Sequence, residues 1–250
     1  MITTRAFLTT LLSAGAIALR APLLVIALSL LPAVADLSPI QYNRPQFPEV
    51  SDRGTPRKTT GAGSRGCEAE AAPVNLNLLA PTHTAVTASG RPSFYWRVSN
   101  VTPVSIRFTL VEPRVSKPLV DQEMTVTEGG IVRLEMPENA PELQEGKEYR
   151  WTVAVICDPN RPSTNIVAKS LIQRVSPSSE LASQLAATSS DYERGQIYAQ
   201  AGYWNDALDA IATSYTQQPN TATLNNLLAF LQQGEVSQIT ARDWQNSTNF

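Results

Sequence analysis

The chain has 250 residues, of which 42% are hydrophobic and 17% charged, with a formal net charge of -2, one histidine and two cysteines. This inventory excludes a four-cysteine iron–sulfur cluster, and it leaves His83, Cys67 and Cys157 as the only zinc ligands besides carboxylates. The near-neutral balance argues against nucleic-acid binding, which requires a basic surface. We therefore expect no metal, no cofactor and no nucleic-acid partner.

The first 35 residues have the composition of a secretory signal peptide. Arg5 and Arg20 are the only charged residues before Asp36, and the apolar run after Arg20 ends in Ala33-Val34-Ala35. Signal peptidase accepts this small-x-small pattern, so we expect cleavage after Ala35 and a periplasmic or secreted protein without a transmembrane segment. The alternative is an uncleaved anchor, although the run after Arg20 is shorter than the ~20 residues that cross a bilayer.

Export changes the interpretation of Cys67 and Cys157. Two cysteines in an exported chain, with none left over, predict one disulfide. Because the bridge would close a long loop, the chain-entropy model gives it on the order of 4 kcal/mol of stabilisation. The alternative is a reactive cysteine, which requires an environment that lowers its pKa, and the only histidine is distant in the sequence.

Residues 36–66 are predicted to form a disordered linker, because they are rich in proline and glycine and have almost no apolar periodicity. Their small excess of basic residues would allow a weak tether to an anionic surface. A solvated spacer is the simpler interpretation.

Residues 67–176 are predicted to form an antiparallel β-sandwich. Apolar and polar residues alternate with a period of two, as at Phe94, Trp96 and Val98, and turn residues such as Gly129-Gly130 separate the runs. Short strands at this spacing, without helical periodicity, are typical of sandwiches. Seven strands are expected, near residues 74–79, 92–98, 103–112, 118–126, 130–136, 147–157 and 164–175.

Two motifs in this region carry a resemblance. Leu143-x-x-Gly146-x-x-Tyr149-x-Trp151 resembles the start of the sixth strand in fibronectin type III and related immunoglobulin-like domains, where a tyrosine hydrogen-bonds back to the preceding corner. Arg91-Pro92-x-Phe94-x-Trp96 resembles their second strand, in which a tryptophan fills the core. The resemblance implies a seven-stranded immunoglobulin-like β-sandwich, with Leu143, Gly146 and Tyr149 as a corner of the tyrosine type.

Residues 177–234 are predicted to form a small helical domain. Ser178 is placed to cap a helix near residues 178–187, and Ser190-x-x-Glu193 is a capping-box pattern. The residues that follow resemble a tetratricopeptide repeat, which implies two close helices joined by a glycine turn and ended by a proline. The residues that carry this resemblance are Gly195, Tyr198, Gly202, Trp204, Ala207, Ile211 and Pro219.

Three expectations complete the helical part. Asn205 is placed to cap the second helix of the repeat, and a helix near residues 221–233 is expected to cover the pair, because one repeat cannot bury its own apolar face. Residues 235–250 are expected to form a polar tail, from which Trp244 could dock back.

Several further motifs occur in order along the chain. They are Gly66-Cys67, Met136-Pro137-x-x-Ala140-Pro141, Val155-Ile156-Cys157-Asp158-Pro159, Ile172-Gln173-Arg174-Val175, Leu181-Ala182-Ser183-Gln184-Leu185 and Tyr203-Trp204-x-Asp206-Ala207-Leu208. Together they resemble a cyanobacterial domain-of-unknown-function family, number nine-two-eight, over about residues 55–233. The resemblance implies an exported cyanobacterial protein, and it carries over no catalytic residue.

The sequence offers little support for an enzyme. His83 lies in a predicted loop without a Gly-x-Ser-x-Gly nucleophile motif, so a hydrolase that uses it is the weakest interpretation. Glu138, Glu142 and Glu145 could be taken for glycosidase carboxylates, but their Pro/Glu-rich turn is more typical of a solvated surface.

Binding is therefore the better hypothesis. Tyr95, Arg97 and Arg107 are expected on the solvent faces of strands, where they could bind a glycan by stacking or a protein by edge pairing. The acidic helical region could take a peptide or serve only for solubility. We expect a non-catalytic adaptor of the cell envelope whose partner is an envelope or extracellular protein, with a glycan-binding module for surface polysaccharide as the alternative.

Overall fold

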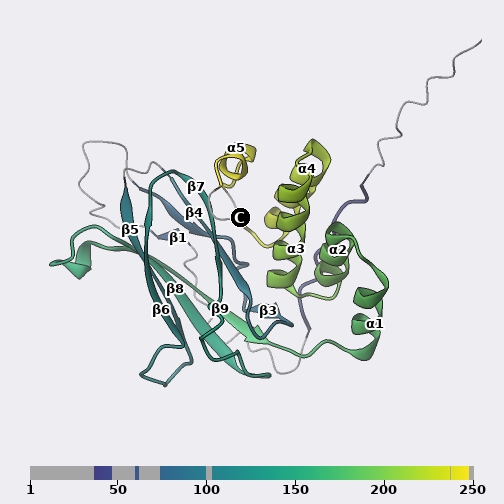
Figure 1. Cartoon of the computed structure of the whole chain (residues 1–250), viewed down its shortest axis with the longest axis horizontal. Coiled ribbons are helices and arrows are strands. Elements are labelled where there is room, and N and C mark those ends of the chain that lie inside the picture. The colour runs from purple at the N-terminus through teal and green to yellow at the C-terminus, as the bar shows by residue number, and fades with distance from the viewer. Residues whose placement is uncertain (1–36, 47–59, 62–73, 100–102, 237, 248–250) are drawn as a thin grey trace, which may run out of the picture. The chain divides into compact units, whose positions relative to one another are not determined.

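A computed structural model of the chain describes residues 37–46, 60–61, 74–99, 103–236 and 238–247. These residues belong to one unit, Asp36–Phe250, in which the strands precede the helices along the chain (Figure 1). The predicted signal peptide forms the other unit, Met1–Ala35, and it lies outside the described residues. The chain is therefore of mixed β and α class.

The described strands form two sheets. The order of the four-stranded sheet is β1-β2-β4-β7, and that of the five-stranded sheet is β3-β9-β8-β5-β6. The strands are β1 Thr60–Gly61, β2 Leu76–Leu78, β3 Ala85–Thr87, β4 Ser93–Val98, β5 Val104–Val111, β6 Val120–Val126, β7 Gly130–Glu135, β8 Glu148–Ile156 and β9 Ile166–Arg174.

The sequence predicts seven antiparallel strands, and the structure contains each of them within a few residues of the expected ends. The expected number and the purely antiparallel pairing are both wrong. The two additional strands are β1, in the predicted linker, and β3, which pairs with β9 in parallel (Ala85↔Ile172). Both are too short, at two and three residues, to produce a detectable alternation of apolar and polar side chains.

The inner faces of the two sheets share one hydrophobic core. Phe94 of β4 lies 5.0 Å from Phe108 of β5 and 5.1 Å from Trp151 of β8, measured between ring centroids. Trp96 stacks on Phe108 at 6.0 Å. These are the alternating aromatic positions of the sequence. Their burial removes a large apolar area from water, which is the main source of stability for the two-layered part.

The helices are α1 Ser179–Ala187, α2 Asp191–Gln200, α3 Trp204–Gln217, α4 Thr221–Gln233 and α5 Ala241–Gln245. The Ser178 and Ser190 hydroxyls accept hydrogen bonds from backbone amides at the starts of α1 and α2, as the capping patterns predict. The expected cap at Asn205 is wrong. Its amide instead donates to the Ser93 carbonyl, because the start of α3 faces the sheet.

The helices and the four-stranded sheet share a second core. Helix α3 lies against β3 and β4, α5 lies against β7, and Figure 1 shows the helices gathered on one side of the sheets. Tyr95 and Ile131, on the outer face of this sheet, are buried together with Trp204 and Ile211 of α3. The predicted boundary near residue 176 is therefore crossed by a continuous core.

Two segments that the sequence assigns to a linker and a tail also contribute to this core. Ile40 is 2% exposed although it lies in the predicted disordered linker, because residues 37–46 lie along the helices. Near the C-terminus, a capping box between Thr240 and Asp243 starts α5, and Trp244 is buried at 1% exposure. An isolated Ile or Trp in a polar stretch gives no periodicity, which explains why composition misassigns both segments.

Candidate functional site

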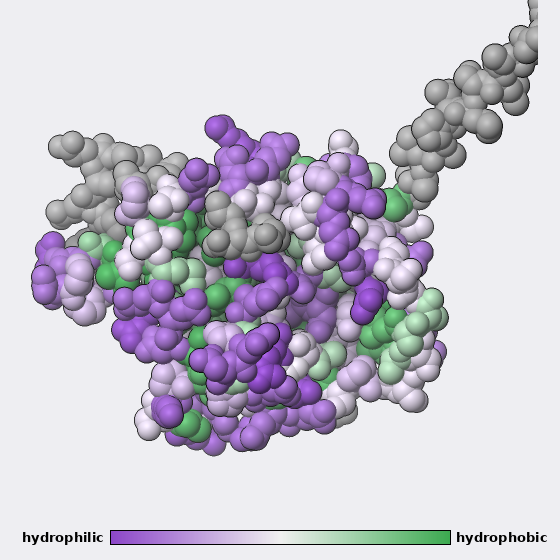
Figure 2. Space-filling view, viewed as in Figure 1, coloured by the Kyte–Doolittle hydropathy of each residue, from purple (hydrophilic) through white to green (hydrophobic). Residues whose placement is uncertain are grey.

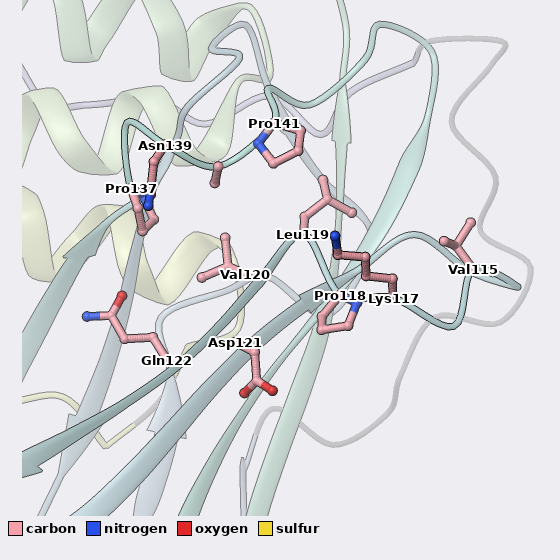
Figure 3. A pocket seen from close by; sticks show the side chains of 11 residues that line it. Val115, Lys117, Pro118, Leu119, Val120, Asp121, Gln122, Pro137, Asn139 and Pro141 are labelled. Carbon is pink, nitrogen blue, oxygen red and sulfur yellow. The ribbon is translucent and has the colours of Figure 1, made fainter.

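A groove of about 710 Å³ lies at one side of the two sheets. Strand β6, an outer strand of the five-stranded sheet, forms its floor. The β5–β6 loop forms one wall, and the loop that follows β7 forms the other (Figure 3). Its lining residues are Val115, Lys117, Pro118, Leu119, Val120, Asp121, Gln122, Pro137, Asn139, Ala140 and Pro141.

Strand β6 gives the groove a backbone edge. In the part of the chain that the structure describes, β6 pairs only with β5, so alternate amides and carbonyls along its other edge have no strand partner. Side chains alternate along it: Val120 and Gln122 project toward the Pro137–Pro141 loop, whereas Asp121 projects away (Figure 3). The floor therefore combines an apolar side chain, an amide and main-chain hydrogen-bonding groups.

The Asp121 carboxylate is held on the outer face by Arg107 of β5. The Arg107 guanidinium donates two hydrogen bonds to it, at 2.7 and 2.6 Å. These hydrogen bonds hold the pKa of Asp121 below its ordinary value. Asp121 therefore stays ionised and does not turn its charge into the groove.

The wall formed by the β5–β6 loop is mainly apolar. A turn in which the Val115 amide donates to the Glu112 carbonyl at 3.1 Å places Val115 at the rim, where it is 45% exposed. Arg114 has a φ of 71°, a left-handed conformation that lets the chain reverse within this turn. Pro118 and Leu119 continue the wall toward β6.

The opposite wall is held in place by two arginines. The Arg91 guanidinium donates to the carbonyls of Glu138 (3.1 Å) and Ala140 (3.2 Å), and it also pairs with the Glu142 carboxylate. Arg174 donates to the Leu143 carbonyl at 2.6 Å. Because these contacts fix the loop that follows β7, this wall of the groove is preformed, as small-molecule and peptide sites usually are.

The groove has the chemistry of a binding surface. It offers aliphatic and proline side chains, a lysine ammonium and two side-chain amides, those of Gln122 and Asn139. The lining set contains no histidine, cysteine, serine or aromatic side chain. Across the described ranges, no group of three or more histidine, cysteine or carboxylate side chains is placed to hold a metal ion.

The sequence-based assignment of Tyr95 and Arg97 to a solvent-facing binding surface is wrong. Tyr95 is 2% exposed, and its hydroxyl donates to Asp209 of α3 at 2.5 Å. The Arg97 guanidinium pairs with the carboxylate of Asp243 in α5 at 2.5 Å. Both side chains point out from the sheet as the alternation predicts, but the helices cover that face.

Arg107 is the one member of that predicted set that lies at the surface, with its side chain 47% exposed. It belongs to the five-stranded sheet, whereas Tyr95 and Arg97 belong to the four-stranded one. The three residues therefore do not form a common face.

His83 lies in the interior rather than in a solvent-facing loop. It is 7% exposed, its ring stacks on that of Tyr42, and its Nε2 lies 2.8 Å from the Tyr42 hydroxyl. Among the carboxylates considered in the sequence, Glu142 pairs with Arg91 and Arg174. These groups serve packing and loop positioning.

Only one of the two cysteines, Cys157, lies among the described residues. Cys157 is half-buried just after β8 and packs against the core between the sheets. Cys67 lies outside the described residues, as do the cleavage position after Ala35 and most of the predicted linker. The disulfide and the cleavage stay predictions. None of the described helices has the length and apolar character needed to cross a membrane.

The corner motif comes together at the start of β8. The Tyr149 hydroxyl accepts a hydrogen bond from the Gln144 amide at 2.9 Å, and Leu143 beside it is fully buried. Gly146 has a φ of 73°, a conformation that favours glycine.

The repeat motif likewise comes together in α2 and α3. A β-carbon on Gly195 would lie 2.6 Å from Ile211 Cγ1, so glycine is needed where the two helices meet. Gly202 forms the turn with a φ of 86°. Trp204 and Ala207 are fully buried, Tyr198 is half-buried, and Pro219 directly follows Gln218, the C-cap of α3.

The groove itself was missed at the sequence level. The available signal was a pair of proline-containing segments, Pro113–Pro118 and Pro137–Pro141, that flank β6 and β7. Prolines in such numbers mark loops, but they do not show that two loops meet.

The comparisons with known proteins identify a family but no curated relative. None of the curated proteins matches this chain. The family model described as Domain of Unknown Function (DUF928) matches residues 60–243, which include both sheets, the groove and helices α1 to α4. The chain therefore belongs to the DUF928 family.

Proposed function

We propose that the protein is a non-catalytic adaptor that binds an extended polypeptide segment in the groove along β6. The observation that carries this proposal is the coincidence of two features: an edge of β6 that has no strand partner among the described residues, and a largely apolar groove beside that edge. An added strand gains main-chain hydrogen bonds along such an edge, and neighbouring pockets select its alternate side chains.

The chemistry of the lining favours a peptide over a sugar. Glycan sites commonly use stacking on an aromatic ring, and the groove lining contains none. The prolines and aliphatic side chains of the walls suit apolar side chains of a partner, while Lys117, Gln122 and Asn139 can bind its polar groups.

We also propose a fold type for the two sheets and for the helix pair α2 and α3. We infer that the two sheets are an immunoglobulin-like sandwich, supported by the Tyr149–Gln144 hydrogen bond at the start of β8. We infer that α2 and α3 are a single tetratricopeptide-like unit, supported by the close approach at Gly195. Both are scaffolds that commonly serve binding rather than catalysis.

Location in the cell envelope is proposed from the first 35 residues and from the two cysteines. Mass measurement of the purified chain should give a start at Asp36. Peptide mapping without reduction should recover Cys67 joined to Cys157. A chain that starts at Met1, or one with two unmodified thiols, contradicts this part of the proposal.

The binding proposal is tested by selection of peptides from a random library on the full chain. Selected peptides should lose at least ten-fold in affinity for Val115→Glu, which places a charge at the rim of the groove. The matched control is Val167→Glu, because Val167 in β9 is equally exposed (46%, against 45% for Val115) and lies outside the groove. Peptides that bind both variants as tightly as the wild type contradict the proposal.

A further inference from the structure

Residues 37–46 have no regular secondary structure, yet they are held as an extended ligand would be. The segment runs beside α2 and α4, and side chains of these helices bind its main chain. The surface that holds it, called here the helical groove, consists of Tyr192, Gln196, Ala199, Phe230 and Gln233, together with Trp204 of α3.

Gln233, the last residue of α4, holds the middle of the segment. Its amide nitrogen donates to the Ile40 carbonyl at 2.9 Å, and its amide oxygen accepts from the Tyr42 amide at 2.8 Å. One side-chain amide therefore satisfies a carbonyl and an amide two residues apart, as a neighbouring strand would. This contact does not depend on the identity of the side chains in the segment.

Helix α2 holds the two ends of the segment. The Tyr192 hydroxyl and the Gln196 amide both donate to the Ser38 carbonyl, at 2.8 and 2.9 Å. The Asn43 amide donates to the Ala199 carbonyl at 3.1 Å, and its side chain donates to the Gln200 carbonyl at 2.8 Å. The Ala199 carbonyl also accepts from the Gly202 amide at 3.1 Å, so it receives the Asn43 amide as a further donor at the end of α2.

Two side chains of the segment provide the apolar contact. Ile40 is 2% exposed, and the Tyr42 ring packs edge-on against Trp204 (4.9 Å) and Phe230 (5.8 Å). The Tyr42 hydroxyl reaches His83, and burial raises the pKa of this phenol. Gly202 allows the close approach, since a β-carbon there would lie 3.1 Å from the Asn43 carbonyl oxygen and from Pro45.

These contacts are those of a peptide receptor with its ligand: main-chain hydrogen bonds at both ends and the middle, and two anchor side chains two positions apart. The segment is connected to β1 only through residues 47–59. A stretch of that length spans up to roughly 45 Å when extended, which is enough to serve a groove in the same copy or in a neighbouring one.

We propose that the helical groove is a receptor for extended segments, and that two copies of the chain associate by exchanging residues 37–46. The second copy is the occupant that the structure supports, because its segment has the side chains and the spacing that the groove already accepts. Each copy would supply one segment and one groove, which gives a closed, two-fold assembly. Within one copy, the covalently attached segment is present at a high effective concentration and competes with the segment of a second copy for the groove. Exchange between copies is therefore favoured when folding occurs at high protein concentration.

The test uses the full chain and a fluorescent peptide of residues 37–46. Ile40→Asp releases the chain's own segment and leaves the groove unchanged, so the peptide should bind this variant at least ten-fold more tightly than it binds the wild type. Adding Gln233→Ala to the Ile40→Asp chain should reduce that affinity at least ten-fold. Tyr42→Ala releases the segment through a different contact and decides the test if Ile40→Asp fails to fold.

Exchange between copies is measured by sedimentation after refolding at high concentration. The wild type should form dimers, and Ile40→Asp should not. Failure of the peptide to bind either folded variant, binding that is insensitive to Gln233→Ala, or a wild type that stays monomeric would each overturn the inference. Val167→Glu, at an exposed position of β9 outside both grooves, should leave both measurements unchanged.

Discussion

The molecule has two grooves that suit an extended chain, and only one of them is filled by the protein itself. The helical groove holds residues 37–46, with Ile40 and Tyr42 buried in it. The groove along β6 is open, and Val115 at its rim is 45% exposed. The filled groove is part of the folded core, whereas the rim of the open groove is exposed to solvent.

The two grooves also differ in how they would recognise a backbone. The helical groove uses side chains, such as the Gln233 amide, to bind carbonyls and amides. The β6 groove offers a strand edge instead, flanked by two proline-containing loops, and Arg91 holds the loop that follows β7. Substitutions should therefore reduce folding stability in the first case and ligand binding in the second.

The largest effect is expected at the base of the filled groove. Trp204 is fully buried, stacks on Phe230 at 4.3 Å and donates to the Leu79 carbonyl at 3.0 Å. Trp204→Ala should lower the free energy of unfolding by about 3 to 5 kcal/mol, because it leaves a large cavity. Chemical denaturation measures this value, and Trp204→Phe should lose clearly less. A loss under about 1 kcal/mol would show that the helices do not depend on this core.

The next effect compares one aliphatic residue from each groove. Ile40→Ala should cost about 2 to 3 kcal/mol of stability, since it removes buried methyl groups. Val115→Ala should change stability by no more than about 0.5 kcal/mol, as is usual for exposed positions. Denaturant midpoints of the two variants provide the comparison. Equal losses of stability in the two variants would show that Ile40 contributes no more to the fold than Val115 does, and would contradict the distinction between a filled and an open groove.

A pH dependence is expected at the contact between the helices and the strands. Burial raises the pKa of Asp206 from its ordinary value of 3.8 to about 6, although the Ala88 amide donates to its carboxylate at 3.0 Å. Because the folded-state pKa exceeds the unfolded-state value, folding takes up a proton between these values. The contribution of Asp206 to stability is therefore complete below pH 3.8 and is lost as the pH rises through 6.

The size of this effect follows from the shift. One pKa unit corresponds to about 1.4 kcal/mol, and Asp206 is still partly exposed, so we expect no more than about 2 kcal/mol. Asp206→Asn should remove this part of the pH dependence between pH 4 and pH 7, as measured by unfolding at several pH values. An unchanged slope in the variant would exclude Asp206 as the titrating group.

The smallest effect is expected at the Arg107–Asp121 pair beside the open groove. Both side chains are partly exposed, at 47% and 34%, and exposed ion pairs contribute less than about 1 kcal/mol. Arg107→Ala should therefore leave the thermal midpoint nearly unchanged. It should weaken binding of the selected peptides, because the Asp121 carboxylate is then free to turn its charge into the apolar groove. Unchanged peptide affinity would show that Arg107 is not needed to keep this charge out of the groove.

Strands with strict alternation were predictable, and so were most helices. The pattern at Phe94, Trp96 and Val98 locates β4, and the spacing from Gly195 to Ala207 locates α2 and α3. Strand β3 could not be found, because three residues have no measurable period and its pairing with β9 is distant in sequence. Local patterns identify elements, and long-range pairing is not a local property.

The candidate sites were less predictable than the elements. Alternation gives the side of the sheet on which Tyr95 lies, but not whether helices cover that side. The coverage depends on contacts such as Tyr95 to Asp209 and Arg97 to Asp243, which join residues more than a hundred positions apart. The face shown in Figure 2 is mostly hydrophilic, with small apolar patches, and composition alone could not locate the β6 groove.

The central claim is that the β6 groove is open to a ligand while the helical groove is already filled. Amide hydrogen exchange can be measured for each residue with and without a selected peptide. This one experiment tests whether the β6 groove is open and whether the helical groove is filled. We expect the outward-facing amides of β6 to exchange quickly in the protein alone and to become protected when the peptide binds. The Tyr42 amide, bonded to Gln233, should be protected in both states. Unchanged exchange along β6 in the presence of the bound peptide would contradict the claim.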